Sequence, residues 1–103
     1  MGQREQNEAF LRERFSYQLK EPHKYAVVMY NDDFTPMDFV VELLKCVFHY
    51  DAGKAYELMM TVHKSGEAVV GTYTYDIAAT KRARAMSMAK EAGYPFRVEM
   101  REV

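Results

Sequence analysis

Residues 25–36 read YAVVMYNDDFTP, an uncharged apolar run followed at once by a polar turn. The apolar run, residues 25–30, consists of β-branched, aromatic and other apolar residues, which predicts a central strand buried on both faces of a sheet. The turn, residues 31–36, holds three side chains with oxygen acceptors and one hydroxyl, and such residues favour turns because they bond to nearby backbone. A simple connection needs only one or two of them, so the turn is also a candidate binding site.

A helix is predicted directly after this turn. Thr35 is expected to be its N-cap and Pro36 its first residue, since both residue types are favoured at those positions. The helix is expected to continue to about His49, because apolar residues recur at three- and four-residue spacing. These residues are Met37, Val40, Val41, Leu44, Val47 and Phe48.

Another helix and another strand are predicted next. The second helix starts at Asp51 and ends at Ser65 and Gly66, since Asp is a good N-cap and glycine a common helix end. Residues 67–73 then have the composition of a strand, in which Gly71 marks a bulge or a close approach of another group.

The last predicted elements are a third helix and a third strand. Thr74 is expected to cap the helix, and Gly93 and Pro95 are expected to end it. Residues 96–102 alternate apolar and charged side chains, which is typical of a strand with one wet face. The inner face of the third helix is expected to consist of Ile77, Ala78, Ala85, Met88, Ala89 and Ala92.

This order of elements predicts a small single domain of the α+β class. Its expected architecture is a three-stranded, mainly antiparallel sheet with three helices packed on one face. The domain is expected to comprise residues 25–103. Residues 1–24 are rich in Glu, Arg and Gln and poor in apolar side chains, so a flexible N-terminal extension is expected there, with Pro22 near the boundary.

Composition excludes several functional classes. The chain has 14 basic and 15 acidic residues and a net charge of -1, which argues against a general binder of nucleic acid or anionic membranes. One cysteine, Cys46, suits a reducing compartment, and it is expected to be a small packing residue within the first helix. No signal peptide or membrane-spanning run is apparent, so the chain is expected in the cytoplasm.

Motifs for catalysis or metal binding are not apparent either. Asp32, Asp33 and His63 have suitable ligand chemistry, but the usual local metal-binding spacings are missing, so no metal or other cofactor is expected. No nucleophile motif or phosphate-binding glycine loop is present, so an enzyme is not expected. Lys81, Arg82 and Arg84 form a basic run that is expected to be a solvated helix face, able to dock an acidic partner or RNA.

A binding site accounts better for the polar turn. Asn31, Asp33 and neutral His63 all present acceptors, which an ammonium group with three donors requires. If the first two helices meet, their apolar side chains form a cup with these acceptors at its mouth. Such a cup suits a free α-amino group attached to a bulky apolar side chain, although the same side chains are also common in plain cores. The side chains concerned are Met37, Val40, Met59 and Val62.

Three segments together closely resemble the ClpS family of bacterial adaptors. They are YNDDFTPMDFV at residues 30–40, AYELMMTVH at residues 55–63 and GEAVVG at residues 66–71. The resemblance extends from about residue 24 to the C-terminus. It implies an adaptor that brings N-degron substrates, beginning with Phe, Tyr, Trp or Leu, to a Clp AAA+ unfoldase of the ClpA-like or ClpC-like type.

The resemblance also implies roles for individual residues. Asn31 and His63 hold the substrate's α-amino group, with help from Asp33 and Asp32. Two residues match a docking surface for the unfoldase, Asp76 and Lys81, and the unfoldase engages the N-terminal extension. The implied hydrophobic pocket consists of Thr35 near the mouth, Met37 as a gatekeeper, Val40, Met59 and Val62 as walls, and Phe96, a larger residue than the family's usual leucine.

Two other functions are compatible with parts of the pattern. The order of elements also resembles the C-terminal domain of the ribosomal stalk protein, which would make the chain a ribosome-associated interaction domain. A small hydrolase using Asp33 and His63 is a second alternative. As an adaptor, the chain is expected to be a monomer and to bind neither nucleic acid nor membranes.

Overall fold

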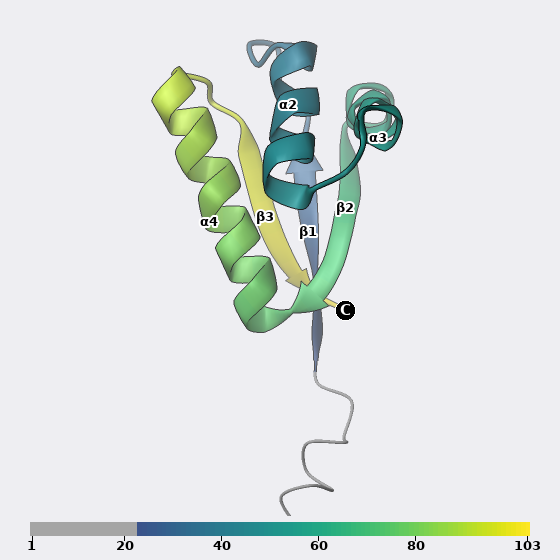
Figure 1. Cartoon of the computed structure of the whole chain (residues 1–103), viewed down its shortest axis with the longest axis vertical. Helices are drawn as coiled ribbons and strands as arrows, with labels where there is room; N and C mark the ends of the chain where they lie inside the picture. The colour runs from purple at the N-terminus through teal and green to yellow at the C-terminus, as the bar shows by residue number, and fades with distance from the viewer. Residues whose placement is uncertain (1–22) are drawn as a thin grey trace, which may run out of the picture.

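The computed structural model describes residues 23–103 and confirms the order of elements predicted from the sequence. The strand β1 is followed by two helices, a strand, a third helix and a third strand (Figure 1). Of the extension predicted over residues 1–24, the structure describes only His23 and Lys24, and Lys24 is the first residue of β1. The rest of the predicted extension lies outside the described residues. The elements are β1 (Lys24–Tyr30), α2 (Met37–Phe48), α3 (Ala52–Ser65), β2 (Glu67–Thr74), α4 (Tyr75–Ala92) and β3 (Arg97–Glu102).

The sheet has β1 at its centre. The strand order is β2-β1-β3, and β1 pairs antiparallel with both neighbours, so the sheet is wholly antiparallel. The four residues Ala26, Val27, Val28 and Met29 are each no more than 2% exposed, which confirms the prediction of a strand buried on both faces.

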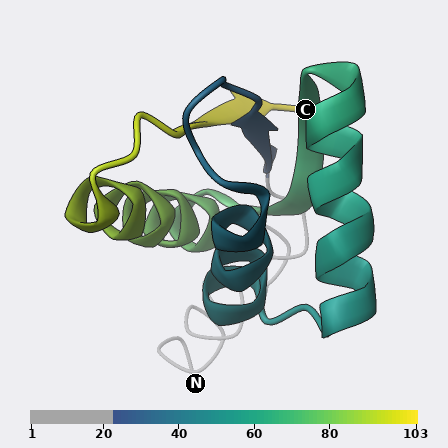
Figure 2. The same ribbon diagram turned by 90° about the horizontal axis from the view of Figure 1, so that it is seen from above.

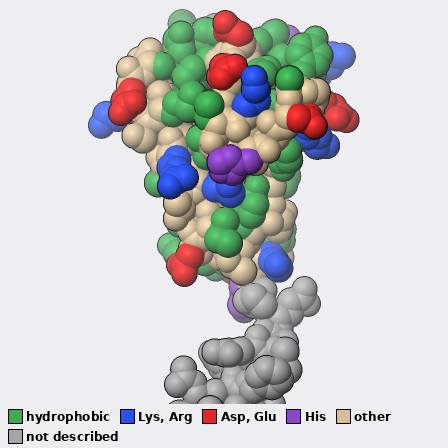
Figure 3. All heavy atoms as spheres, in the orientation of Figure 1, with side chains coloured by type: hydrophobic (Ala, Val, Ile, Leu, Met, Phe, Trp, Pro, Cys, Tyr) green, Lys and Arg blue, Asp and Glu red, His purple; other side chains and the backbone are tan. Residues whose placement is uncertain are grey.

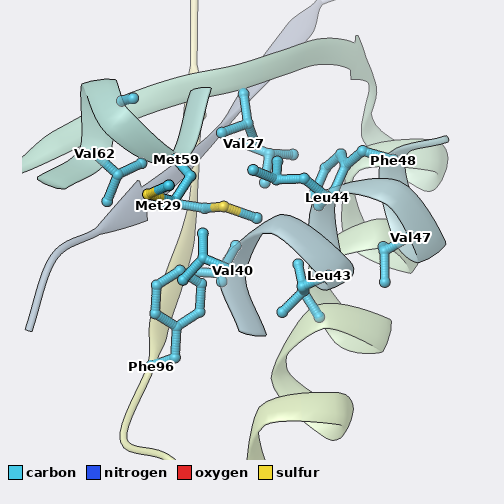
Figure 4. Packing of buried hydrophobic residues seen from close by; sticks show 14 of the residues in the cluster. Val27, Met29, Val40, Leu43, Leu44, Val47, Phe48, Met59, Val62 and Phe96 are labelled. Atoms are coloured by element: carbon cyan, nitrogen blue, oxygen red, sulfur yellow. The ribbon is translucent and has the colours of Figure 1, made fainter. Parts of the chain in front are cut away.

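All three helices cover one face of the sheet. Seen from above, α2 lies between α3 and α4, with the sheet above α2 in the view and α3 running alongside it (Figure 2). Side chains alternate between the two faces of a strand, so Val27 and Met29 of β1 both point to the helical side. They belong to one buried cluster with Leu43 and Leu44 of α2 (Figure 4).

Charged and aromatic side chains cover the opposite face of the sheet. The guanidinium of Arg97 lies 3.9 Å from the centroid of the Tyr30 ring, and Arg101 donates to Tyr30 Oη at 3.2 Å and to Glu67 Oε2 at 3.1 Å. The register places Arg101 beside Ala26, which is buried on this side. Exposed ion pairs stabilise a protein by no more than about 1 kcal/mol each. The main contribution of Arg97 and Arg101 is therefore that their aliphatic stems cover β1.

The expected irregularity in β2 occurs at Gly71. The pairing with β1 passes from Gly71 opposite Val27 to Val69 opposite Val28, which leaves Val70 as an extra residue. A Cβ on Gly71 would lie 2.6 Å from ring carbons of Tyr73, whose side chain folds back over the glycine. Both readings of Gly71, a bulge and a close approach, are therefore confirmed.

Helix ends follow the expected signals in α3 and at the end of α4, where Gly93 has φ 81°, and they depart from them at the starts of α2 and α4. Asp51 Oδ1 accepts from Lys54 N at 2.8 Å, and Gly66 ends α3 in the left-handed region with φ 86°. Thr74 occupies the N-cap position of α4, but its side chain makes no capping hydrogen bond. Within residues 23–103, no helix is both long and apolar enough to cross a bilayer.

The expected core needs four corrections. Leu43, absent from the predicted stripe, is fully buried, because α2 contacts a helix on each side and buries a wider arc than an edge helix does. Ile77 is 49% exposed, and Ala92 is also exposed, since α4 buries only a narrow stripe of alanines. Cys46 is exposed rather than packed, with its Sγ 4.0 Å from Glu42 Oε2.

Substitution of Leu43 by Ala should destabilise the domain far more than Ile77→Ala. Leu43→Ala leaves a cavity in the core and is expected to lower the free energy of unfolding by about 2–5 kcal/mol. Ile77→Ala removes a half-exposed side chain and is expected to change it by about 1 kcal/mol or less. Urea unfolding followed by circular dichroism measures both values, and equal destabilisation would contradict this assignment of the core.

Candidate functional site

The turn between β1 and α2 is organised by the carboxylate of Asp32. Its Oδ1 accepts from Phe34 N at 2.8 Å and from Thr35 N at 2.7 Å, and its Oδ2 accepts from Thr35 Oγ1 at 2.7 Å. Three hydrogen bonds to one charged group make this a well-defined loop. Asp32, which the family resemblance implicates in ligand binding, therefore also forms hydrogen bonds with Thr35 within the turn.

Thr35 is not the N-cap of α2, contrary to the prediction. The N-cap is Pro36, which has no side-chain acceptor, and α2 begins one residue later than expected, at Met37. The reason is that the Thr35 hydroxyl donates to the Asp32 carboxylate, a stronger acceptor than the alternatives at a helix start. The carbonyl of Pro36 still receives the first helical bond, from Val40 N at 3.3 Å.

These hydrogen bonds also control the ionisation of Asp32. Burial raises the pKa of its carboxyl, but the hydrogen bonds from Thr35 and Phe34 lower it by more, so the pKa lies below the usual value of 3.8. Asp32 is therefore a carboxylate at neutral pH and holds a negative charge at this end of the domain.

One backbone hydrogen bond joins the turn to the end of α3. Asn31 N donates to Gly66 O at 2.8 Å, and Gly66 N donates in turn to Val62 O at 2.9 Å. His63 lies in this last turn of α3, after Val62. The end of β1 and the end of α3 are thus held side by side, and this places Asn31 and His63 at the same small hollow.

A small cup lies between this turn, α2, α3 and the segment before β3. It is lined by nine residues, all of them predicted site residues, and its volume is about 10 Å³, roughly the space of one water molecule. Of the residues predicted to bind the ligand, only Asp33 does not line the cup; it lies exposed in the same turn. The lining residues are Asn31, Asp32, Thr35, Met37, Val40, Met59, Val62, His63 and Phe96.

Burial divides the cup into a polar rim and an apolar floor. Asn31 and His63 are exposed, whereas Val40, Met59, Val62 and Phe96 are buried (Figure 4). Met37 belongs to neither group, since it lines the cup and is 43% exposed. The arrangement matches the predicted cup with acceptors at its mouth, but the cup is closed against anything as large as a benzyl or isobutyl group.

A second and much larger hollow adjoins the cup and was not predicted. This α2 groove has a volume of about 800 Å³, runs along the outer side of the first half of α2, and shares Met37 and Met59 with the cup. Sequence reasoning missed it because its walls come from three helices whose relative positions no local pattern encodes. The groove is lined in addition by Asp38, Phe39, Val41, Glu42, Tyr56, Met88 and Tyr94.

The predicted docking residues lie on α4, away from the cup. Asp76 is exposed in the first turn of α4. Lys81 donates through Nζ to Val47 O at 3.0 Å and lies 5.4–5.6 Å from the ring centroids of Tyr73 and Phe48. It therefore binds a carbonyl in the last turn of α2, where a cation is favourable.

The prediction that Lys81, Arg82 and Arg84 form one solvated face is wrong for its first two members. Arg82 Nε donates to Val98 O at 2.8 Å on the edge strand β3, and both Lys81 and Arg82 are partly buried. Their face of α4 is turned toward α2 and β3, so the basic groups find acceptors within the domain. Arg84 is exposed as expected.

No metal centre is indicated in the described part of the chain. Across residues 23–103, no three side chains of His, Cys, Asp or Glu lie together in a way that could hold a metal ion. The expectation that the protein uses no metal remains a prediction.

A small α+β domain with an acceptor-rimmed apolar cup has the form of a domain that recognises a small amphipathic group. Comparison with known proteins makes the class specific. Residues 20–99 match the model of the family described as ATP-dependent Clp protease adaptor protein ClpS. The chain belongs to the ClpS family.

Individual relatives agree with this membership. The chain is 48% identical over 83 residues to the ClpS of Syntrophus aciditrophicus, covering 81% of this chain and 78% of that protein. It is 48% identical over 90 residues to the ClpS of Cupriavidus metallidurans, covering 87% and 83%. Agrobacterium tumefaciens ClpS2 bound to L-phenylalaninamide has a similar structure, with a TM-score of 0.78 and 40% identity over 81% of this chain and 100% of that chain.

The contribution of the Asp32 carboxylate should depend on pH. Because its pKa is lower in the folded chain than in the unfolded one, its stabilisation is fully present above the usual value of 3.8 and is lost as the pH falls through the lower folded value. We expect Asp32→Asn to reduce the free energy of unfolding by about 1 kcal/mol at pH 7 and by clearly less at pH 3.

Urea unfolding of the wild type and of Asp32→Asn at both pH values measures this difference. Asp33→Asn serves as the control, because Asp33 is the exposed neighbouring carboxylate in the same turn. An Asp32→Asn effect of the same size at pH 3 and pH 7 would disprove the role of the charge.

Proposed function

We propose that this chain is an adaptor that binds the N-terminal residue of a substrate and delivers the substrate to a Clp AAA+ unfoldase-protease. The ligand is a free α-amino group with a bulky apolar side chain, as in N-terminal Phe, Tyr, Trp or Leu. The observation that carries the proposal is the union of an acceptor-bearing rim and a buried apolar floor in one cup. L-phenylalaninamide, the molecule bound to the Agrobacterium ClpS2, combines the same two groups.

The rim provides for the ammonium group. The side-chain oxygen of Asn31 and the unprotonated nitrogen of His63 act as neutral acceptors, and Asp33 adds a negative charge in the same turn. Asp32 contributes a second charge, but its carboxylate already accepts three hydrogen bonds, two from Thr35 and one from Phe34. Its main role is therefore to hold the turn in shape, with a direct contact to the amino group as a secondary one.

The floor provides for the side chain, and it must open to do so. A cavity of about 10 Å³ does not admit a benzyl group, so Met37 and Met59 must change rotamer when the ligand enters. Met37 is suited to be the gatekeeper because it is partly exposed at the border of the cup. Phe96 is nearly fully buried, and its ring narrows the floor more than a leucine would.

Selectivity follows from the cost of unmet acceptors. A substrate with an acetylated or extended N-terminus lacks an ammonium at the rim, so the acceptors lose water without gaining donors. Each such unsatisfied group costs roughly 1–3 kcal/mol, or about a tenfold to hundredfold loss of affinity. The stalk-domain alternative does not account for acceptors placed around an apolar cup, and the hydrolase alternative would need a nucleophile beside His63.

The remaining parts of the proposal concern partners and setting. Asp76 and Lys81 on α4 form the docking surface for a ClpA-like or ClpC-like unfoldase, and residues 1–24 are the segment that the unfoldase engages. The protein acts as a cytoplasmic monomer, catalyses no reaction itself, and uses no cofactor, nucleic acid or membrane.

Loss of either rim acceptor should weaken binding of a free N-terminal residue. For a fluorescent peptide beginning with Phe, we expect Asn31→Ala and His63→Ala each to reduce affinity about tenfold or more, without unfolding the domain, because both side chains are exposed. The N-acetylated peptide should bind weakly to all variants. Fluorescence anisotropy measures these affinities.

A matched control is available at the other exposed helix end. His49, the C-cap of α2, is likewise an exposed histidine at the end of a helix, but it adopts a left-handed conformation with φ 61°, so His49→Asn is the appropriate replacement. This variant should bind like the wild type. Equal affinity of the wild type for free and acetylated peptides would refute the proposed function.

Reversal of charge at the proposed docking surface should separate unfoldase binding from peptide binding. We expect Asp76→Lys to weaken binding to a purified Clp unfoldase about tenfold and to leave affinity for the Phe peptide unchanged. Glu91→Lys is the control, since Glu91 is an equally charged, exposed residue in the last turn of α4. Surface plasmon resonance with ClpA-like and ClpC-like unfoldases gives the affinities, and equal effects of the two variants would contradict docking through Asp76.

A further inference from the structure

The α2 groove is an apolar surface that the proposed function does not use. Figure 3 shows hydrophobic side chains gathered over α2 and its neighbours at the end of the molecule opposite the grey chain, with acidic groups between them. Tyr56 in this groove is 58% exposed, and Phe39, Val41 and Met88 are partly buried. A volume of about 800 Å³ is within the range of sites that hold ligands.

The groove is continuous with the proposed binding site. Met37 and Met59 line both hollows, so the groove begins where the wall of the cup ends. A polypeptide advances about 3.3–3.6 Å per residue, which keeps the second and third residues of a bound substrate within reach of a surface that starts at the cup.

One wall of the groove is rigid and the others are adaptable. The rings of Phe39 and Tyr94 pack edge to face, with their centroids 4.9 Å apart and their planes at 68°, and this joins the start of α2 to the residues after α4. Met37, Met59 and Met88 supply flexible thioether side chains around it. Such a surface suits apolar side chains of different shapes better than one specific group.

We infer that the α2 groove binds an apolar side chain at the second or third position of the substrate polypeptide whose N-terminal residue occupies the cup. The inference rests on the proposed function, because the cup determines where the second residue starts. It makes recognition depend on a short N-terminal sequence, with the first residue required and an apolar residue after it favoured.

Peptides of identical composition test this inference. Three peptides begin with Phe, continue with Ser and Gly, and carry one Leu at position two, three or seven. We expect Leu at position two or three to improve affinity about three- to tenfold over Leu at position seven, because only the near positions bury it in the groove. Competition against a fluorescent Phe peptide, read by anisotropy, gives the ratios.

Variants then locate the effect in the groove. The position ratio is the affinity for the peptide with Leu at position two or three divided by the affinity for the peptide with Leu at position seven. Tyr56→Ser and Val41→Ser should bring this position ratio close to one. They should leave affinity for the position-seven peptide unchanged, since neither residue lines the cup. Tyr75→Ser is the matched control, because Tyr75 is 57% exposed, like Tyr56, but lies at the start of α4. It should keep the wild-type ratio.

The outcomes distinguish this inference from the proposed function. If the position-seven peptide binds only when its amino group is free, but all positions of Leu bind equally, the cup stands and the groove inference is overturned. A position ratio unchanged by Tyr56→Ser and Val41→Ser also overturns it. If sedimentation shows a dimer that Tyr56→Ser abolishes and the position ratio is one, the groove is occupied by a second copy instead. No binding of any free Phe peptide would remove both proposals.

Discussion

The strand β1 is hydrogen-bonded along both edges and covered on both faces, and the positions of the other elements follow from this. On the face toward the helices, Val27 and Met29 pack against leucine and valine side chains of α2 and α3. The other face is covered by arginine and tyrosine side chains. The turn that follows β1 is therefore held at one defined place, at the edge of the helical layer.

Asp32 converts that turn from a connection into a stable part of the proposed site. By accepting from two backbone N–H groups and one hydroxyl, its carboxylate fixes the loop in which Asn31 and Asp33 lie. The bond from Asn31 N to Gly66 O then joins the loop to the end of α3. The proposed recognition groups are thus positioned mostly by backbone contacts, and within residues 23–103 no hydrogen bond occupies the side chain of Asn31 or His63.

The cup and the groove differ in how much of their proposed binding surface is open in this structure. The cup has a polar rim and a closed floor, so the proposed ligand would have to displace methionine side chains and spend part of its binding energy on that change. The groove is open and needs no such change. With Met37 and Met59 common to both, movement of these two side chains links entry into the cup to the shape of the groove. A shared flexible wall is a simple physical basis for reading more than one residue of a substrate.

Sequence by itself determined the order and type of all six elements, since helical and strand periodicity are local properties. The residues around the polar turn also pointed to an acceptor-rimmed cup, whereas Phe96 entered only through the family resemblance. The structure also showed that Thr35 bonds to Asp32 rather than capping α2, a choice between two local partners that the residue pattern left open. Tertiary structure alone decided that Lys81 and Arg82 bind carbonyls of α2 and β3, and that Leu43 is buried while Ile77 is not. It also decided the closed state of the cup and the existence of the groove. Each of these depends on which groups from distant segments meet, and the free energy of such contacts is not encoded in any short stretch of the chain.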